Sequence, residues 1–289
     1  MSLFIPAPEG PYVASQVVPV TYHKRAWRIR SRRTVMVSGQ ILVFLVAVGI
    51  WDVAATHWVE SFLLSRPILV LAELGEWAAT GFVLPHLAAT FGEMALGVLL
   101  GSAVGIGLAV LFRLSPFIAE VFEPFVMATY SLPRIAFIPL LIVWFGAGMT
   151  STVVFTAMAV FLMMFASAAA GMRDVDPDMM NAIRLMGARQ SDLLRWVVLP
   201  QAMTFIFSGL MLAVPFALVS ALAAELMTGS VGLGYLLSYG LGFFDAPMIY
   251  ATTILLAVLG TVINLVLIVF ANRALAWKIR PESRARQRR

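Results

Sequence analysis

Three ionisable residues stand inside long apolar stretches of the sequence: Glu93, Arg134 and Glu225. An ionised side chain inside a membrane is costly, so such residues commonly face a solute pathway or pair with a buried partner. We therefore predict Glu93, Arg134 and Glu225 to be pathway residues. A structural role, such as pairing or bonding to the carbonyls of a broken helix, is the alternative for Arg134 and Glu225.

Other kinds of chemistry find little support in the sequence. The absence of cysteine excludes disulfides, thiolate metal sites and cysteine nucleophiles. No G-x-x-x-x-G-K-[ST] motif occurs, so the chain is not expected to bind ATP in a Walker site or to be an ATP-hydrolysing enzyme itself. Ser167 and Ser208 have no histidine at comparable depth to activate them, which argues against an intramembrane hydrolase.

No metal or other cofactor is predicted. The three histidines are too scattered in the sequence to form a recognisable metal site. Asp174, Asp176 and Asp178 imitate the spacing of a calcium loop, but Met179 stands where such a loop needs glycine and Leu185 where it needs glutamate. Helix capping is the better account of these aspartates.

A polar stretch from residue 174 to 201 separates two apolar runs. Asp176 followed by Pro177 predicts a helix start, because an aspartate accepts from the free N–H groups and proline suits the first helical position. Gly187 predicts the end of that helix.

A second short helix is predicted over residues 192–198. Ser191 would cap it, and Pro200 would end it because proline lacks the N–H group that a continuing helix needs. Two short amphipathic helices between membrane runs indicate that a soluble partner docks on them.

The spacing of this stretch resembles the EAA loop of ABC importer permeases. The family pattern is Glu-Ala-Ala, three residues, Gly, nine residues and Ile-x-Leu-Pro. Here Asn181-Ala182-Ile183, Gly187 and Val197-Val198-Leu199-Pro200 have the same spacing, with Asn181 in place of Glu and Ile183 in place of the second Ala. In the family this loop inserts into a groove on the ATPase subunit. The resemblance implies that the ATPase-coupling residues are Asp176, Asn181, Ala182, Gly187, Ala188, Leu199 and Pro200.

The resemblance covers about residues 63–278 and is nearest to the nitrate/sulfonate/taurine-type branch, whose permeases carry segments like SLPRIAFIPLLIVWFG and GLGYLL. Arg134 stands where related permeases often have Lys or Arg, and Glu225 resembles the glutamate before their Gly-Leu-Gly segment. The resemblance implies an all-α, type I importer permease, present as a homodimer. Its partners would be cytoplasmic ATP-binding subunits and an extracytoplasmic solute-binding protein.

Composition independently indicates a membrane protein, since 61% of the residues are hydrophobic and only 12% are charged. Uncharged runs of 19 to 36 residues are long enough for helices of the roughly 20 residues that cross a bilayer. The runs predict six spans, at 34–56, 88–112, 117–145, 150–170, 202–227 and 248–275.

Basic residues predict the orientation of these spans. Eighteen of the twenty Lys and Arg residues fall on one side of the predicted spans, which predicts that both termini and the 171–200 loop are cytoplasmic. The chain is thus expected to be a multi-pass protein of the bacterial inner membrane. Residues 59–85 and 229–246 would be extracytoplasmic. The net positive charge is then explained by membrane orientation and by attraction to anionic lipid headgroups, and nucleic acid is not an expected partner. The domain boundaries that follow are a cytoplasmic tail at 1–33, a permease domain at 34–278 and a basic tail at 279–289.

Three local patterns complete the prediction. Apolar residues at helical spacing between Leu63 and Pro85 predict a helix on the outer surface. Gly97, Gly101 and Gly105 allow close helix approach, either within the chain or between subunits. Three prolines predict that the third span is a broken helix, as is typical of a translocation pathway: Pro124, Pro133 and Pro139.

The function predicted is the transmembrane permease subunit of an ABC importer for a small organic or inorganic anion such as a sulfonate, taurine or nitrate. A thiamine-precursor pyrimidine or an aromatic acid is the alternative solute. An ion-driven secondary transporter is a more remote alternative, because it would normally carry inverted repeats and paired intramembrane acids and would not need the loop at 171–200.

Overall fold

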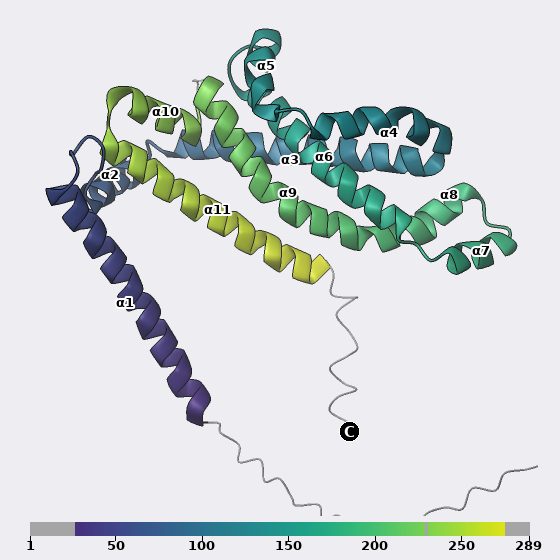
Figure 1. Ribbon diagram of the computed structural model, residues 1–289, viewed down its shortest axis with the longest axis horizontal. Helices are drawn as coiled ribbons and strands as arrows, with labels where there is room; N and C mark the ends of the chain where they lie inside the picture. The colour runs from purple at the N-terminus through teal and green to yellow at the C-terminus, as the bar shows by residue number, and fades with distance from the viewer. Residues whose placement is uncertain (1–26, 229–230, 275–289) are drawn as a thin grey trace, which may run out of the picture. The chain divides into compact units, whose positions relative to one another are not determined.

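The computed structural model describes residues 27–228 and 231–274, and every regular element in that part of the chain is helical (Figure 1). The predicted tails at 1–33 and 279–289 lie outside the described residues, except that α1 already begins at Trp27. The helices are α1 (Trp27–His57), α2 (Pro67–Thr80), α3 (Leu84–Leu114), α4 (Pro116–Tyr130), η1 (Arg134–Phe137), α5 (Ile138–Phe145), α6 (Met149–Arg173), α7 (Pro177–Leu185), α8 (Gln190–Leu193), η2 (Leu194–Val198), α9 (Leu199–Thr228), α10 (Leu233–Phe243) and α11 (Ala246–Ala274).

Five helical segments in the described part of the chain are long and apolar enough to cross a membrane, and a bent pair makes a sixth if it counts as one span. The five are Val35–His57, Leu84–Leu114, Met149–Arg173, Gln190–Thr228 and Ala246–Ala271, and the bent pair is Pro116–Tyr130 with Arg134–Phe145. Each predicted span overlaps one of them. The fifth differs most, because its helix begins at Gln190 and not near residue 202.

The chain divides into two compact units, residues 1–50 and 51–289. In the first unit, apolar side chains are exposed on every face of α1, among them Ile41, Leu42 and Phe44. A helix that is apolar all round requires a nonpolar surrounding. Hydrocarbon is such a surrounding.

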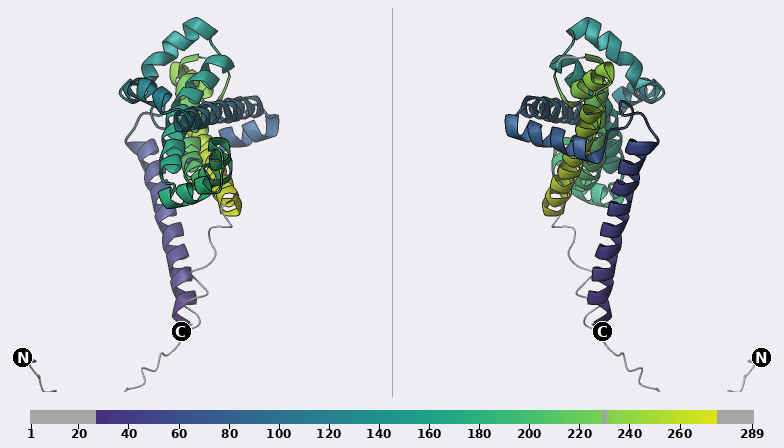
Figure 2. Two further views of the ribbon diagram at one scale, coloured as in Figure 1. Left: turned by 90° about the vertical axis from the view of Figure 1, so that its right-hand side faces the viewer. Right: turned by 90° about the vertical axis from the view of Figure 1, so that its left-hand side faces the viewer.

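In the second unit, α3, α6 and α9 pack side by side and form the core of the bundle (Figures 1 and 2). Small residues let the backbones approach: Gly97, Gly101 and Gly105 of α3 all face α6. A Cβ atom at Gly101 would lie 2.5 Å from the carbonyl oxygen of Ala157. The glycine row therefore packs within the chain, which decides between the two alternatives that the sequence left open.

We expect Gly101→Val to lower the stability of the permease by about 3 kcal/mol, because the added atoms meet backbone that cannot move aside easily. Gly107→Val is the matched control on the same helix, since a Cβ at Gly107 meets nothing within 4 Å. Thermal unfolding of the two purified variants measures the difference. Equal melting temperatures would contradict the packing described for this helix pair.

The third span is broken, as three prolines predict. Helix α4 ends at Tyr130, a turn containing Pro133 follows, and η1 and α5 continue at 96° to α4. The Tyr130 hydroxyl donates a 2.9 Å hydrogen bond to the Leu162 carbonyl oxygen, which fixes the break against α6. Proline at the break removes N–H groups that a straight helix would need.

The segments next to this bundle include one helix that the sequence predicts and one that it does not. Helix α2 lies within the predicted stretch between Leu63 and Pro85, and its buried Val70 and Trp77 share a core cluster with Leu233 and Leu236 of α10. Helix α10 was missed because an 11-residue apolar helix is too short to register as a span.

Candidate functional site

The loop between α6 and α9 begins with a capped helix, as predicted. The Asp176 Oδ1 atom accepts a 2.9 Å hydrogen bond from the Asp178 N–H, and Pro177 occupies the first helical position of α7. Gly187 follows the end of α7 with a φ of +89°, in the region that favours glycine. The predicted helix end is confirmed.

The prediction for the second short helix is wrong at both ends. The cap is made by Asp192, whose Oδ2 accepts a 2.9 Å hydrogen bond from the Arg189 N–H, and not by Ser191. The helix does not stop at Pro200 but continues as α8, the π-helical turn η2 and α9. The N–H of Leu199 bonds to the carbonyl oxygen of Leu194, five residues back. This wider turn accommodates a proline that would break a regular helix at the same place.

The loop has a buried face and an exposed face. Met180, Leu193 and Val197 are buried in a cluster with residues of α6 and α9. By contrast Leu185, Met186 and Trp196 are 90%, 86% and 71% exposed. The predicted coupling residues lie mostly at the surface, since Asp176, Asn181, Ala182, Gly187 and Pro200 are exposed while Ala188 and Leu199 are half-buried.

The structure brings two of the three predicted pathway residues together. Glu93 of α3 and Glu225 of α9 are buried beside one another. The Glu225 Oε2 atom accepts a 2.6 Å hydrogen bond from the N–H of Gly234, at the start of α10. One carboxyl oxygen of each residue, Oε2 of Glu93 and Oε1 of Glu225, is buried without a hydrogen bond.

Sequence reasoning missed two other members of this cluster. The Thr90 hydroxyl accepts a 2.9 Å hydrogen bond from the Leu233 N–H, and the His86 ring lies 3.2 Å from the Gly232 nitrogen. Positions 86, 90 and 93 are three and four residues apart, so they share one face of α3. That spacing is the signal that could have found them. The whole cluster anchors the beginning of α10 to α3 and α9.

Gly232 is required by the same arrangement. Its φ is +125°, and a Cβ there would overlap the Glu225 carboxyl group. The backbone of this segment thus comes close enough for the buried carboxylate to accept from a main-chain N–H. This contact is of the structural kind that the sequence analysis gave as the alternative role of Glu225.

Arg134 lies apart from the two glutamates. It is half-buried at the start of η1 and makes no hydrogen bond or ion pair with any residue that the structure describes. It lines a cavity of about 350 Å³ at the break between α4 and α5. The other lining residues are mainly apolar: Thr129, Leu132, Phe137, Met158, Phe161 and Leu162. A single unpaired guanidinium in such a cavity can bind an anion.

No three histidine, aspartate or glutamate side chains in residues 27–228 and 231–274 gather in a way that could hold a metal ion. A bundle of apolar helices with a broken span, and with the short helix α7 between two spans, is the architecture of a membrane-embedded transport permease. The family described as "Binding-protein-dependent transport system inner membrane component" matches residues 94–277, and the chain belongs to that family. It is therefore a multi-pass inner-membrane component of an ABC importer and not itself catalytic.

Several relatives are similar to this chain over most of its length. The taurine transport system permease protein TauC of Escherichia coli (strain K12) is 28% identical over 87% of this chain and 93% of its own length. A putative aliphatic sulfonates transport permease protein, SsuC of Bacillus subtilis (strain 168), is 26% identical over 82% and 87%. The formylaminopyrimidine transport permease protein ThiX of Halalkalibacterium halodurans is 26% identical over 82% and 94%.

Solved structures share the fold. A chain of an inward-facing MetNI methionine ABC transporter superimposes with a TM-score of 0.53 at 20% identity, over 66% of this chain and 93% of that one. A chain of an amino acid ABC transporter with histidines gives a TM-score of 0.57 at 21% identity, over 69% and 97%. Both likenesses establish an importer-permease fold for this chain. Binding-protein-dependent transport implies ATPase and solute-binding partners.

Proposed function

We propose that two copies of this chain form the pathway for a small organic anion, and that cytoplasmic ATPases drive it by docking on the loop at 171–200. An extracytoplasmic binding protein would deliver the solute. Closure of the ATPases would move α7 and α8 and switch the pathway between two states, one open to each side.

The exposed apolar side chains of the loop carry this proposal. Leu185, Met186 and Trp196 project from a segment whose other face is packed against α6 and α9. Large apolar side chains exposed on an otherwise polar loop are typical of a protein interaction surface. Because the loop is packed against the ends of α6 and α9, a force applied to it passes to two helices of the core.

The cavity at Arg134 favours an anion with an apolar body. The Arg134 guanidinium can donate charge-assisted hydrogen bonds to a sulfonate or carboxylate, while Phe137, Met158 and Phe161 provide apolar walls. An aliphatic sulfonate or taurine would use both features, and nitrate would use only the first. The relatives named for taurine and aliphatic sulfonates support this choice. A pyrimidine, as in the name of the ThiX relative, is the second candidate.

Met186→Asp tests the docking role. Met186 is 86% exposed and lies just after α7, so the change should leave the fold intact but place a charge in an apolar interface. We expect co-purification of the ATPase subunits to fall by about tenfold or more. Leu63→Asp, an exposed apolar position at the other end of the bundle, is the control. Equal ATPase recovery from both variants would contradict docking on this loop.

Cysteine labelling tests the proposed orientation, because the chain has no cysteine of its own. Glu60, in the first predicted outer segment, and Gln190, in the 171–200 loop, are both exposed and can be labelled. Residues 229–230 of the second predicted outer segment lie outside the described part of the chain. An impermeant maleimide should label Glu60→Cys in intact cells and spare Gln190→Cys until the membrane is opened. The reverse pattern would overturn the cytoplasmic placement of the termini and of the 171–200 loop.

A further inference from the structure

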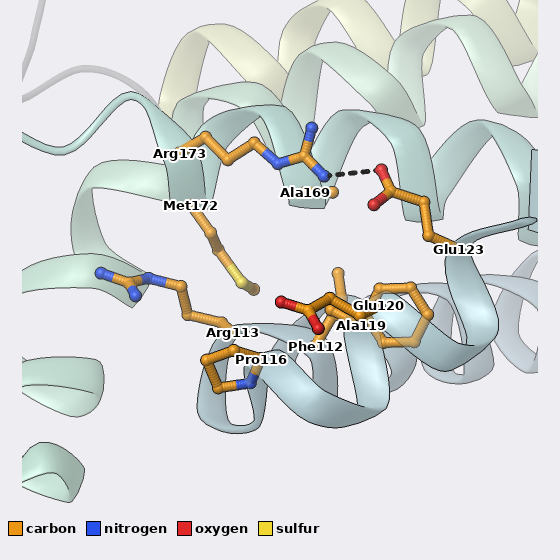
Figure 3. A pocket seen from close by; sticks show the side chains of 10 residues that line it. Phe112, Arg113, Pro116, Ala119, Glu120, Glu123, Ala169, Met172 and Arg173 are labelled. Carbon is orange, nitrogen blue, oxygen red and sulfur yellow. Dashed lines mark hydrogen bonds and ion pairs between the residues drawn. The ribbon is translucent and has the colours of Figure 1, made fainter.

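Three helix ends meet at a second pocket of about 280 Å³ (Figure 3). Arg113 belongs to the last turn of α3, Pro116 begins α4 and Arg173 ends α6. Phe112, Met172, Ala109 and Ala169 supply apolar lining. This pocket is separate from the Arg134 cavity, because the two share no lining residue.

Two guanidinium groups and two carboxylates line this pocket, and only one pair of them is joined. Arg173 donates to Glu123 at 3.2 Å, and Figure 3 shows these side chains reaching toward one another. The Glu120 carboxylate makes no hydrogen bond or ion pair with the described residues. The Arg113 Nε atom is shielded from solvent without a partner. One anionic and one cationic group therefore remain unused.

The pocket lies where two candidate spans end, Leu84–Leu114 and Met149–Arg173. The end of a spanning helix meets the headgroup layer of the bilayer, so charged side chains at this pocket are within reach of lipid headgroups. The helix ends that line the pocket also carry exposed apolar residues, namely Leu111 and Leu114 of α3 and Phe117 and Val121 of α4. Acyl chains would cover such a surface, whereas a soluble ligand would leave it bare.

We propose that this pocket binds the headgroup of an aminophospholipid of the phosphoethanolamine type. The phosphate accepts from Arg113, and the ammonium group donates to Glu120. An anionic lipid without the amine would meet an unpaired carboxylate, and a choline lipid has no N–H group to donate. The placement of the pocket in the cytoplasmic leaflet rests on the orientation proposed above. The lipid preference does not depend on whether the chain transports a solute.

The test uses the assembled transporter, permease with its ATPases, incubated with equal amounts of phosphatidylethanolamine, phosphatidylglycerol and phosphatidylcholine of the same acyl chains. Native mass spectrometry then counts the bound lipids. We expect phosphatidylethanolamine to be retained about fivefold over the other two, the factor that one charge-assisted hydrogen bond at a partly exposed site contributes. Glu120→Gln should abolish that preference, and Arg113→Gln should weaken the binding of all three.

Glu60→Gln, an exposed acid elsewhere on the chain, is the control and should leave the preference unchanged. Equal retention of the three lipids, or a phosphatidylglycerol preference unaffected by Glu120→Gln, would overturn the proposal. Displacement of the lipid by soluble phosphoethanolamine would also overturn it, because the pocket would then take a soluble zwitterion. If Arg113→Gln does not assemble, Glu120→Gln decides alone, since Glu120 makes no contact that the fold needs.

Discussion

Arg134→Ala is expected to lower uptake of an aliphatic sulfonate by about 30-fold at limiting solute, the factor that a hydrogen bond to a charged group contributes. Arg134 lies in a cavity of about 350 Å³ and makes no hydrogen bond or ion pair with the described residues. Its removal therefore breaks no hydrogen bond or ion pair among the residues that the structure describes. Uptake into proteoliposomes containing ATPase and binding protein measures the effect.

The controls separate solute binding from assembly. Arg134→Lys keeps the charge but not the planar fork, so uptake should lie between the wild type and the alanine variant. Arg66→Ala removes an arginine that pairs with Asp52 at 3.1 Å outside the bundle and should transport normally. Unchanged uptake by Arg134→Ala would remove this residue from the pathway. Loss of the complex on gel filtration would give it a role in assembly instead.

Gly187→Val is expected to uncouple transport from ATP hydrolysis while the permease still inserts into the membrane. A valine at φ +89° is strained, since left-handed backbone costs an L residue about 1–2 kcal/mol and a β-branched one more. The chain relieves the strain by reorienting α7 relative to α8. We expect solute-stimulated ATP hydrolysis in reconstituted complexes to fall by about tenfold.

Gly146→Val is the matched control for this experiment. Gly146 has a φ of +81° and, like Gly187, has nothing within 4 Å of a built Cβ atom, but it lies between α5 and α6, outside the loop. Both variants place a β-branched residue at a positive φ, and only one of them alters the proposed docking surface. Wild-type coupling in Gly187→Val, or an equal loss in both, would contradict a docking role for the loop.

Features that depend on nearby residues could be predicted from the sequence alone. The apolar runs predicted six spans, of which five are single helices of spanning length and the sixth corresponds to the bent pair, because a bilayer demands a minimum length of uncharged helix. Asp176, Pro177 and Gly187 determined the cap, the start and the end of α7, since each acts through its own backbone and immediate neighbours.

Tertiary structure decided what depends on distant neighbours. The helix continues through Pro200 because the π-helical turn at Leu194–Val198 accommodates the proline. A rule that considers proline by itself predicts a helix end there instead. The partner of the glycine row could only be found once α3 and α6 were packed.

The same holds for the ionisable residues inside the bundle. Their types and depth were readable in the sequence, but their partners were not. Glu93 and Glu225 are 132 positions apart, yet they are buried side by side, and Thr90 and His86 join them through backbone atoms of the segment before α10. Arg134 instead lines a separate cavity, where it has no hydrogen bond or ion pair with the described residues. Sequence spacing predicts which residues share a helix face, whereas the packing of helices decides which faces meet.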